Sequence, residues 1–224
     1  MTTGGIIVAA GSSTRMGGVD KLLQTVGGRP LITHSIAQFA AHQRIDALVV
    51  VASEANMEAM RTLAAGFTGT NVVPGGERRR DSVLRGLEAL GGCDIVVVHD
   101  GARPLVTPEL ITAAIDGALE VGAALCAVPV SDTVKRGDAS GLVWCTVARE
   151  DLWLAQTPQA FRADILRRAH AAHDTDATDD ATLVELIEEQ VRLVMGRREN
   201  IKVTTPDDLA LVEALMAARG YTAS

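Results

Sequence analysis

The sequence is poor in aromatic residues, cysteines and long apolar runs, and each shortage excludes a class of protein. Only 3% of its 224 residues are aromatic, which argues against a base-stacking platform for single-stranded nucleic acid. Cys93, Cys126 and Cys145 are odd in number and form no CxxC motif, so we expect reduced thiols, not disulfides or a zinc site. With no run long enough to span a membrane and no signal-like segment, we expect a cytoplasmic protein.

Positive charge is scarce as well. The chain has 21 Lys and Arg against 28 Asp and Glu, and the net charge of −7 argues against general binding to nucleic acid or to anionic membranes. Any anionic ligand must therefore be held by cations concentrated in one place. The remaining composition, 47% hydrophobic and 22% charged, is typical of a globular protein, and we expect one domain over residues 1–224.

Apolar runs alternate with amphipathic segments over most of the chain. The expected strands are Ile6–Ala10, Ala47–Ala52, Asn71–Val73, Ile95–His99 and Ala123–Val130. The expected helices are Leu31–Ala40, Ala55–Ala65, Asp81–Leu90 and Pro108–Val121. This order predicts an α/β fold with a doubly wound, mainly parallel sheet covered by helices on both faces.

The alternation ends after Val130. Residues 132–149 show the pattern of an antiparallel hairpin, which is either a flap or an arm that reaches another subunit. Beyond it we expect helices near 163–172 and 180–189, a strand at 191–195, and a final helix capped by Thr205.

Ligands of doubly wound sheets bind at the carboxyl ends of the strands, and four loops at that edge are polar or glycine-rich. They are residues 11–21, 75–80, 100–103 and 132–136. The first loop, GSSTRMGGVDK, combines small residues with two cations, Arg15 and Lys21, which suits a polyphosphate. It matches neither a Walker A loop nor a dinucleotide fingerprint. The alternative, an ordinary glycine-rich turn, is weakened by the coincidence of four such loops.

Two of these loops offer candidate binding groups. Ser82 either faces a ligand or caps the helix that follows GGERRR, whose three arginines we expect to be solvated. Asp100, in HDGARP, can hold a divalent cation or orient a substrate hydroxyl, and Arg103 can bind an anion. The alternative for these two is a mutual ion pair.

Histidine and serine suggest no further chemistry. We expect His99 to be a strand-end residue, and His170 and His173 to be solvated side chains on a helix, not metal ligands. No G-x-S-x-G or S-x-x-K motif is present for a serine hydrolase. The chemistry that remains is direct transfer at phosphorus, driven by cations and positioning.

A set of motifs in order resembles the 2-C-methyl-D-erythritol 4-phosphate cytidylyltransferases of the non-mevalonate isoprenoid pathway: AAGSSTRMGG, GGERRRDSV, HDGARP, DTVKR, VARED with LW, QTPQAF, TDDA and NIKVTTPDDL. The resemblance implies a Rossmann-like nucleotidyltransferase fold, transfer of CMP from CTP with release of pyrophosphate, and a homodimer whose arms interlock. The alternatives are a cytidylyltransferase for another polyol phosphate, such as ribitol 5-phosphate, and a non-catalytic nucleotide-binding protein. Relatives often have Gly where this chain has Ser13, and Pro-Lys-Gln where it has Asp20-Lys21-Leu22.

The resemblance also implies roles at the matching positions. The implied catalytic cations are Arg15, Lys21 and Lys202. The implied CTP-binding residues are Ala9, Ala10, Gly11, Gly76 and Ser82. The implied acceptor-binding residues are Asp100, Arg103, Thr133, Arg149 and Thr178. Thr133 and Arg149 would come from the partner's arm, and Asp100 would also lie near Mg²⁺ or another divalent cation.

Overall fold

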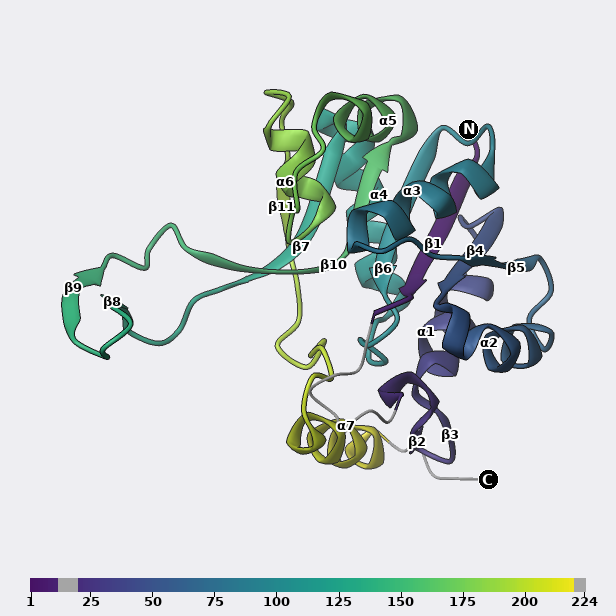
Figure 1. The fold of residues 1–224 in the computed structure, drawn as a ribbon, viewed down its shortest axis with the longest axis horizontal. Helices are drawn as coiled ribbons and strands as arrows, with labels where there is room; N and C mark the ends of the chain where they lie inside the picture. The colour runs from purple at the N-terminus through teal and green to yellow at the C-terminus, as the bar shows by residue number, and fades with distance from the viewer. Residues whose placement is uncertain (12–19, 220–224) are drawn as a thin grey trace.

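A seven-stranded sheet in the order β11-β7-β10-β6-β1-β4-β5 forms the centre of the computed structural model, which describes residues 1–11 and 20–219 (Figure 1). Its strands are β1 (Thr3–Ala9), β4 (Ala47–Ala52), β5 (Thr70–Pro74), β6 (Ile95–Asp100), β7 (Ala123–Pro129), β10 (Trp153–Arg162) and β11 (Arg192–Met195). Neighbouring strands run parallel except where β10 pairs with β6 and β7. The prediction of a mainly parallel α/β sheet is confirmed.

Helices bury both faces of this sheet. One face packs against α1 (Leu31–Ala40), α2 (Met57–Ala64), α4 (Pro108–Val121) and α7 (Pro206–Ala218). The other face packs against α3 (Arg79–Leu90), α5 (Ala163–Ala172) and α6 (Asp180–Glu185). Because strand side chains alternate between faces, Ile7 and Val97 enter the first core while Ile6 and Val96 enter the second.

Short elements complete the described residues. They are η2 (Lys21–Leu23), β2 (Thr25–Val26), β3 (Arg29–Pro30) and η3 (Glu54–Asn56). None of the helices in the described part of the chain has the length and apolar character needed to cross a membrane.

Strand β10 has no counterpart among the strands predicted from the sequence. Its centre, Gln156–Gln159, is polar and contains Pro158, and a proline inside a run usually argues against a strand. Here the pairing of β10 with β7 shifts register between Ala155 and Gln159, so Pro158 falls in a bulge that needs no ladder hydrogen bond. The bulge turns these polar residues into part of a cavity wall, described below.

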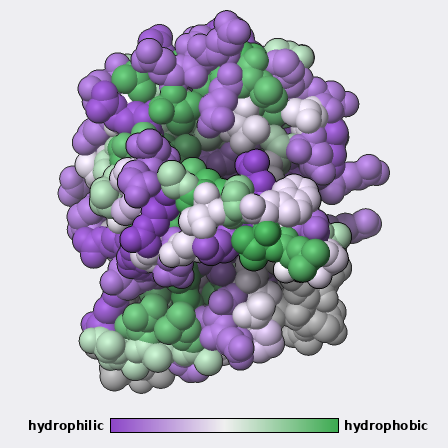
Figure 2. Space-filling view, turned by 90° about the vertical axis from the view of Figure 1, so that its left-hand side faces the viewer, coloured by the Kyte–Doolittle hydropathy of each residue, from purple (hydrophilic) through white to green (hydrophobic). Residues whose placement is uncertain are grey.

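The predicted hairpin is present and lies at the tip of an arm. β8 (Val134–Gly137) pairs antiparallel with β9 (Val143–Val147), far from the sheet (Figure 1). Leu142, Val143 and Trp144 on this hairpin are 67%, 62% and 65% exposed in the single chain. Figure 2 looks at the side that carries the arm and shows apolar side chains, in green, among hydrophilic ones. An isolated two-stranded hairpin with such exposed apolar residues needs another surface to pack against.

Three predicted helices have different boundaries in the structure. Helix α2 covers Met57–Ala64 in place of Ala55–Ala65. Helix α3 begins at Arg79, not Asp81, because the Asp81 carboxylate accepts hydrogen bonds from the backbone N–H and the Nε of Arg78, the N-cap. Helix α6 ends at Glu185, not Glu189, and the chain then turns through Glu188, whose φ is 61°.

Candidate functional site

A cavity of about 360 Å³ opens at the carboxyl ends of β1 and β6. Its walls come from the loops that follow β1, β5 and β6, and from the segment before α7. Eight residues predicted for a site lie in these walls: Ala9, Ala10, Gly11, Lys21, Gly76, Ser82, Asp100 and Lys202. Arg15, also predicted for this site, lies outside the described residues.

Small residues allow the loops after β1 and β5 to meet. A Cβ added to Gly75 would lie 2.5 Å from the Cβ of Ala10, so only glycine fits this approach. Ser82 then fixes the second loop, because its Oγ accepts a hydrogen bond from the N–H of Gly76 and donates one to the carbonyl of Arg78, both at 3.2 Å. Ser82 therefore ties the start of the helix to the loop and also lines the cavity. The two alternatives drawn from the sequence, a role at the helix start and a position facing a ligand, are thus compatible.

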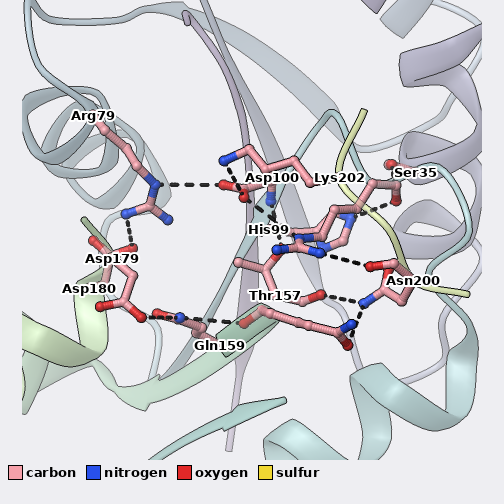
Figure 3. Close-up of polar contacts among 12 residues, drawn as sticks. Ser35, Arg79, His99, Asp100, Thr157, Gln159, Asp179, Asp180, Asn200 and Lys202 are labelled. Carbon is pink, nitrogen blue, oxygen red and sulfur yellow. Dashed lines mark hydrogen bonds and ion pairs between the residues drawn. The ribbon is translucent and has the colours of Figure 1, made fainter. Parts of the chain in front are cut away.

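Asp100, the last residue of β6, stands among three cations. Its Oδ2 lies 2.8 Å from Nζ of Lys202 and 3.7 Å from Nε of Arg103, and its Oδ1 lies 3.6 Å from Nε of Arg79 (Figure 3). Burial alone would raise the pKa of Asp100, but Lys202, Arg79 and Arg103 hold that pKa well below its usual value. The carboxylate is therefore ionised, and the Asp100–Arg103 ion pair considered from the sequence is one part of a larger cluster.

His99 is more than a strand-end residue. It is fully buried, and its Nε2 lies 3.1 Å from the carbonyl of Arg103, which can only accept, so Nε2 carries the proton. Its Nδ1 then accepts from the hydroxyl of Thr157 at 3.0 Å, and that hydroxyl accepts from the N–H of Asp100 (Figure 3). This chain of bonds connects the backbone of β6 with the bulge of β10.

Acid should weaken the fold through His99. Burial lowers the pKa of His99 to about 4, from 6.5, so between these values the unfolded chain binds a proton that the folded protein does not. The stabilisation that comes from keeping His99 neutral in the fold is present above pH 6.5 and is lost as the pH falls toward 4. Between pH 7 and pH 4.5 we expect the protein to lose about 2 kcal/mol more than a His99→Gln variant. Urea unfolding at both pH values measures the difference, and equal losses would contradict a neutral, buried His99.

A second cavity, of about 250 Å³, lies on the other side of the Asp100 cluster. Arg79, Asp100 and Lys202 line both cavities, so these three residues form a common wall. The other lining residues are Arg103, Ala155, Gln156, Thr157, Gln159, Thr178 and Asp179. Arg103 and Thr178 were predicted from the sequence; the residues contributed by β10 were missed because that strand was missed.

Asn200 holds the segment that carries Lys202. It is fully buried, its Nδ2 donates to the carbonyl of Thr157 at 2.8 Å, and its own carbonyl accepts from Nη1 of Arg103 at 2.7 Å (Figure 3). Two residues later, Lys202 reaches Asp100. Asn200 thus fixes the lysine segment against both β10 and the loop after β6. The sequence offered one signal for it, its place at the start of the NIKVT motif.

The prediction that Arg78, Arg79 and Arg80 are solvated is wrong for two of them. Arg80 is 5% exposed and donates to the backbone carbonyls of His170 and His173 at the end of α5. The side chain of Arg79 is 21% exposed and pairs with two carboxylates. The carbonyls that Arg80 contacts, and Asp180, come from α5 and α6, about a hundred residues away, which local sequence could not indicate.

His170 is likewise buried, contrary to the prediction of a solvated side chain. Its side chain is 1% exposed, and its Nε2 lies 3.5 Å from Oδ1 of Asp180. His173, at the end of the same helix, is partly exposed.

The two arm residues predicted for the acceptor site do not line either cavity of their own chain. Thr133 is exposed on the arm, and Arg149 bonds through Nη1 to the carbonyl of Ser131 at the arm's base. Figure 1 shows the arm leading away from the sheet.

A divalent cation fits this site only together with a ligand. Mg²⁺ in nucleotide-dependent enzymes is bound by one or two carboxylates and by substrate phosphates. Asp100 supplies one carboxylate at the wall of both cavities, but no group of three or more His, Cys, Asp or Glu that could hold a metal occurs within residues 1–11 and 20–219. The donor set matches a metal that arrives on a polyphosphate.

Known proteins are similar to this chain in sequence and in fold over almost its whole length. A family model described as IspD: 2-C-methyl-D-erythritol 4-phosphate cytidylyltransferase matches residues 4–218. A protein of that name from Dehalococcoides mccartyi is 44% identical over 216 residues, which are 95% of each chain. A bifunctional enzyme IspD/IspF from Desulforudis audaxviator is 47% identical over 94% of this chain and 56% of its own length.

Solved structures agree. The 4-diphosphocytidyl-2C-methyl-D-erythritol synthase of Anaerococcus prevotii superposes with a TM-score of 0.84 at 29% identity, covering 96% of this chain and 98% of its own. The 2-C-methyl-D-erythritol 4-phosphate cytidylyltransferase of Thermus thermophilus superposes with a TM-score of 0.80 at 33% identity, covering 95% and 98%.

Proposed function

The chain belongs to the 2-C-methyl-D-erythritol 4-phosphate cytidylyltransferase family, and from that membership we propose that its two cavities hold the two substrates of one cytidylyl transfer. CTP occupies the first cavity and methylerythritol phosphate the second. The observation that carries this proposal is the common wall, because phosphates on either side of Arg79, Asp100 and Lys202 lie next to each other. We place the reaction in the cytoplasm, the location expected from the sequence.

The first cavity suits CTP along its whole length. Residues 9–11 offer backbone without bulky side chains to the triphosphate, and Lys21 supplies charge to it. The family resemblance gives Arg15, which lies outside the described residues, the same role. Gly76 and Ser82 border the far end, where a small pyrimidine edge meets backbone and hydroxyl groups.

The second cavity suits a phosphorylated polyol. Asp100 and Thr178 provide groups for hydroxyls, and Arg103 provides a guanidinium for the phosphate. Burial lowers the pKa of Arg103 without removing its charge, so it remains a cation inside the wall.

The reaction is an in-line displacement at the α-phosphorus of CTP. A phosphate oxygen of the acceptor forms the new P–O bond while the bond to the β-phosphate oxygen breaks, and pyrophosphate leaves. The attacking oxygen is already anionic, so no general base and no covalent enzyme intermediate are needed. Lys202 and Lys21 offset the repulsion between the two anions and stabilise the charge that develops on the phosphoryl oxygens. When Mg²⁺ is bound by Asp100 and the phosphates, it supplies further positive charge.

The arm completes the second cavity of a partner chain. Its exposed apolar hairpin, and the absence of Thr133 and Arg149 from the lining of their own chain's two cavities, support a two-fold dimer with interlocked arms. In this dimer Thr133 and Arg149 contact the acceptor bound to the partner.

The nucleotide preference tests the first cavity. We expect kcat/KM for CTP to exceed that for GTP or ATP by about 100-fold or more, because Ser82 fixes the loop at Gly76 in a geometry that we assign to a small pyrimidine edge. Pyrophosphate release from each nucleotide with methylerythritol phosphate measures this. Equal pyrophosphate release from CTP and GTP would contradict the assignment of Gly76 and Ser82 to recognition of cytosine.

Crossing the same nucleotides with a series of polyol phosphates tests the reaction itself. Faster pyrophosphate release with ribitol 5-phosphate than with methylerythritol phosphate would identify ribitol 5-phosphate as the better acceptor. If no pair of nucleotide and polyol phosphate releases pyrophosphate, the protein is a nucleotide-binding protein without transferase activity.

A further inference from the structure

Arg79 occupies the boundary between the two cavities with part of its guanidinium unused. Nη1 pairs with Oδ2 of Asp180 at 2.7 Å, and Nε faces Oδ1 of Asp100 at 3.6 Å, which is too long for a hydrogen bond (Figure 3). Nη2 is buried and has no hydrogen-bond partner among the described residues. The edge formed by Nε and Nη2 is therefore the edge from which Arg79 can bind an anion in a two-pronged manner.

Asp180 fixes the opposite edge. It is fully buried at the first position of α6, and its second oxygen faces Nε2 of His170 at 3.5 Å without forming a hydrogen bond in the described part of the chain. His170 belongs to α5, so two helices confine the carboxylate that holds Arg79. Although burial raises the pKa of Asp180, the charge of Arg79 keeps that pKa below its usual value.

Such a pair does little for stability by itself. Removing two charges from water costs free energy that their attraction only partly returns, and apolar side chains of similar size often stabilise as well. What the pair does provide is a fixed orientation for a long, flexible side chain. That orientation matters where two phosphates must approach each other, because small misplacements of catalytic groups cost large factors in rate.

We infer that Asp180, supported by His170, is a positioning residue that presents the Nε–Nη2 edge of Arg79 to the reacting phosphates at the boundary between the cavities. The inference rests on the proposed cytidylyl transfer and adds Arg79 to the groups that contact substrate. Asp180 itself never touches substrate in this arrangement; it acts only through Arg79.

Kinetics of Asp180→Asn, Arg79→Ala and the double variant test this. Asp180→Asn should lower kcat by on the order of 10²-fold, with little change in KM for CTP, because the misplacement affects the meeting of the phosphates. In the Arg79→Ala background the same substitution should cause no further loss. Asp164→Asn, which removes a carboxylate from the first turn of the neighbouring α5 and lies outside both cavities, is the matched control and should keep wild-type kinetics.

Guanidinium at millimolar concentration provides a second measurement. It should restore activity several-fold to Arg79→Ala, where Asp180 can hold it, and not to the double variant; sodium chloride at equal ionic strength should restore neither. If Asp180→Asn does not fold, Asp180→Glu, which keeps the charge and shifts it, takes its place in the kinetic measurement.

Two results would overturn the inference: equal losses from Asp180→Asn in both backgrounds, or equal rescue of Arg79→Ala and the double variant. Absence of pyrophosphate release by the wild-type enzyme would instead contradict the proposed function, so the two failures are distinguishable.

Discussion

A mixture of two inactive variants, Lys202→Ala and Arg149→Ala, should recover about a quarter of wild-type activity after unfolding and refolding together. Lys202 lines the cavities of its own chain, whereas Arg149 lies on the arm that we assign to the partner's site. In a mixed dimer one site then collects both lesions and the other collects neither. Random pairing makes about half of the dimers mixed, so about a quarter of all sites are intact. No recovery, with mixed dimers demonstrated, would show that each arm serves its own subunit.

The reverse mixture is the control. When a chain carrying both substitutions is refolded with an equal amount of wild type, every site of a mixed dimer has one lesion if the arms exchange, and about a quarter of full activity remains. If the arms do not exchange, each mixed dimer keeps one intact site and about half remains. If the arms exchange, both mixtures therefore have about a quarter of wild-type activity. If the arms do not exchange, the first mixture has none and the second has about half.

Lys21→Ala should lower kcat by on the order of 10²–10³-fold, because the lysine acts on charge that develops at phosphorus. Lys21 opens the short helix η2 at the wall of the first cavity. Its removal should leave the melting temperature nearly unchanged, since the core at this point is made by Leu22. Steady-state kinetics and thermal unfolding measure the two effects.

A distant cation is the control for Lys21. Arg192→Ala removes a positive charge from an exposed pair with Glu120, outside both cavities, and should keep wild-type turnover. Near-normal turnover of Lys21→Ala would exclude this lysine from the mechanism.

The sequence was sufficient to predict the parallel part of the sheet and the first cavity, because both depend on local patterns. A buried parallel strand is a continuous apolar run, as in Ile95–His99, and its carboxyl end fixes where Asp100 must lie. The second cavity depends on contacts between distant segments. Strand β10 interrupts its apolar pattern with Gln156–Gln159, and only the bulge explains why a strand survives there.

The burial of Arg79 shows the same limit. Three consecutive arginines at a helix start have the local pattern of a solvated face. Arg79 is only partly exposed because Asp100 and Asp180, from elements before and after the arm, converge on it in the folded chain. Patterns within one segment predict which face of a helix is apolar, but not which charges meet across a sheet.

The position of β10 also has a consequence for synthesis of the chain. β7 precedes β10 in the sequence, yet β10 lies between β7 and β6 in the sheet and joins them. While the ribosome adds the arm, the apolar strands β6 and β7 each have an edge that is not yet paired with β10. Unpaired edges of apolar strands promote aggregation. The nascent sheet closes only when residues 153–162 emerge and enter the gap, so the length of the arm also sets how long that gap stays open.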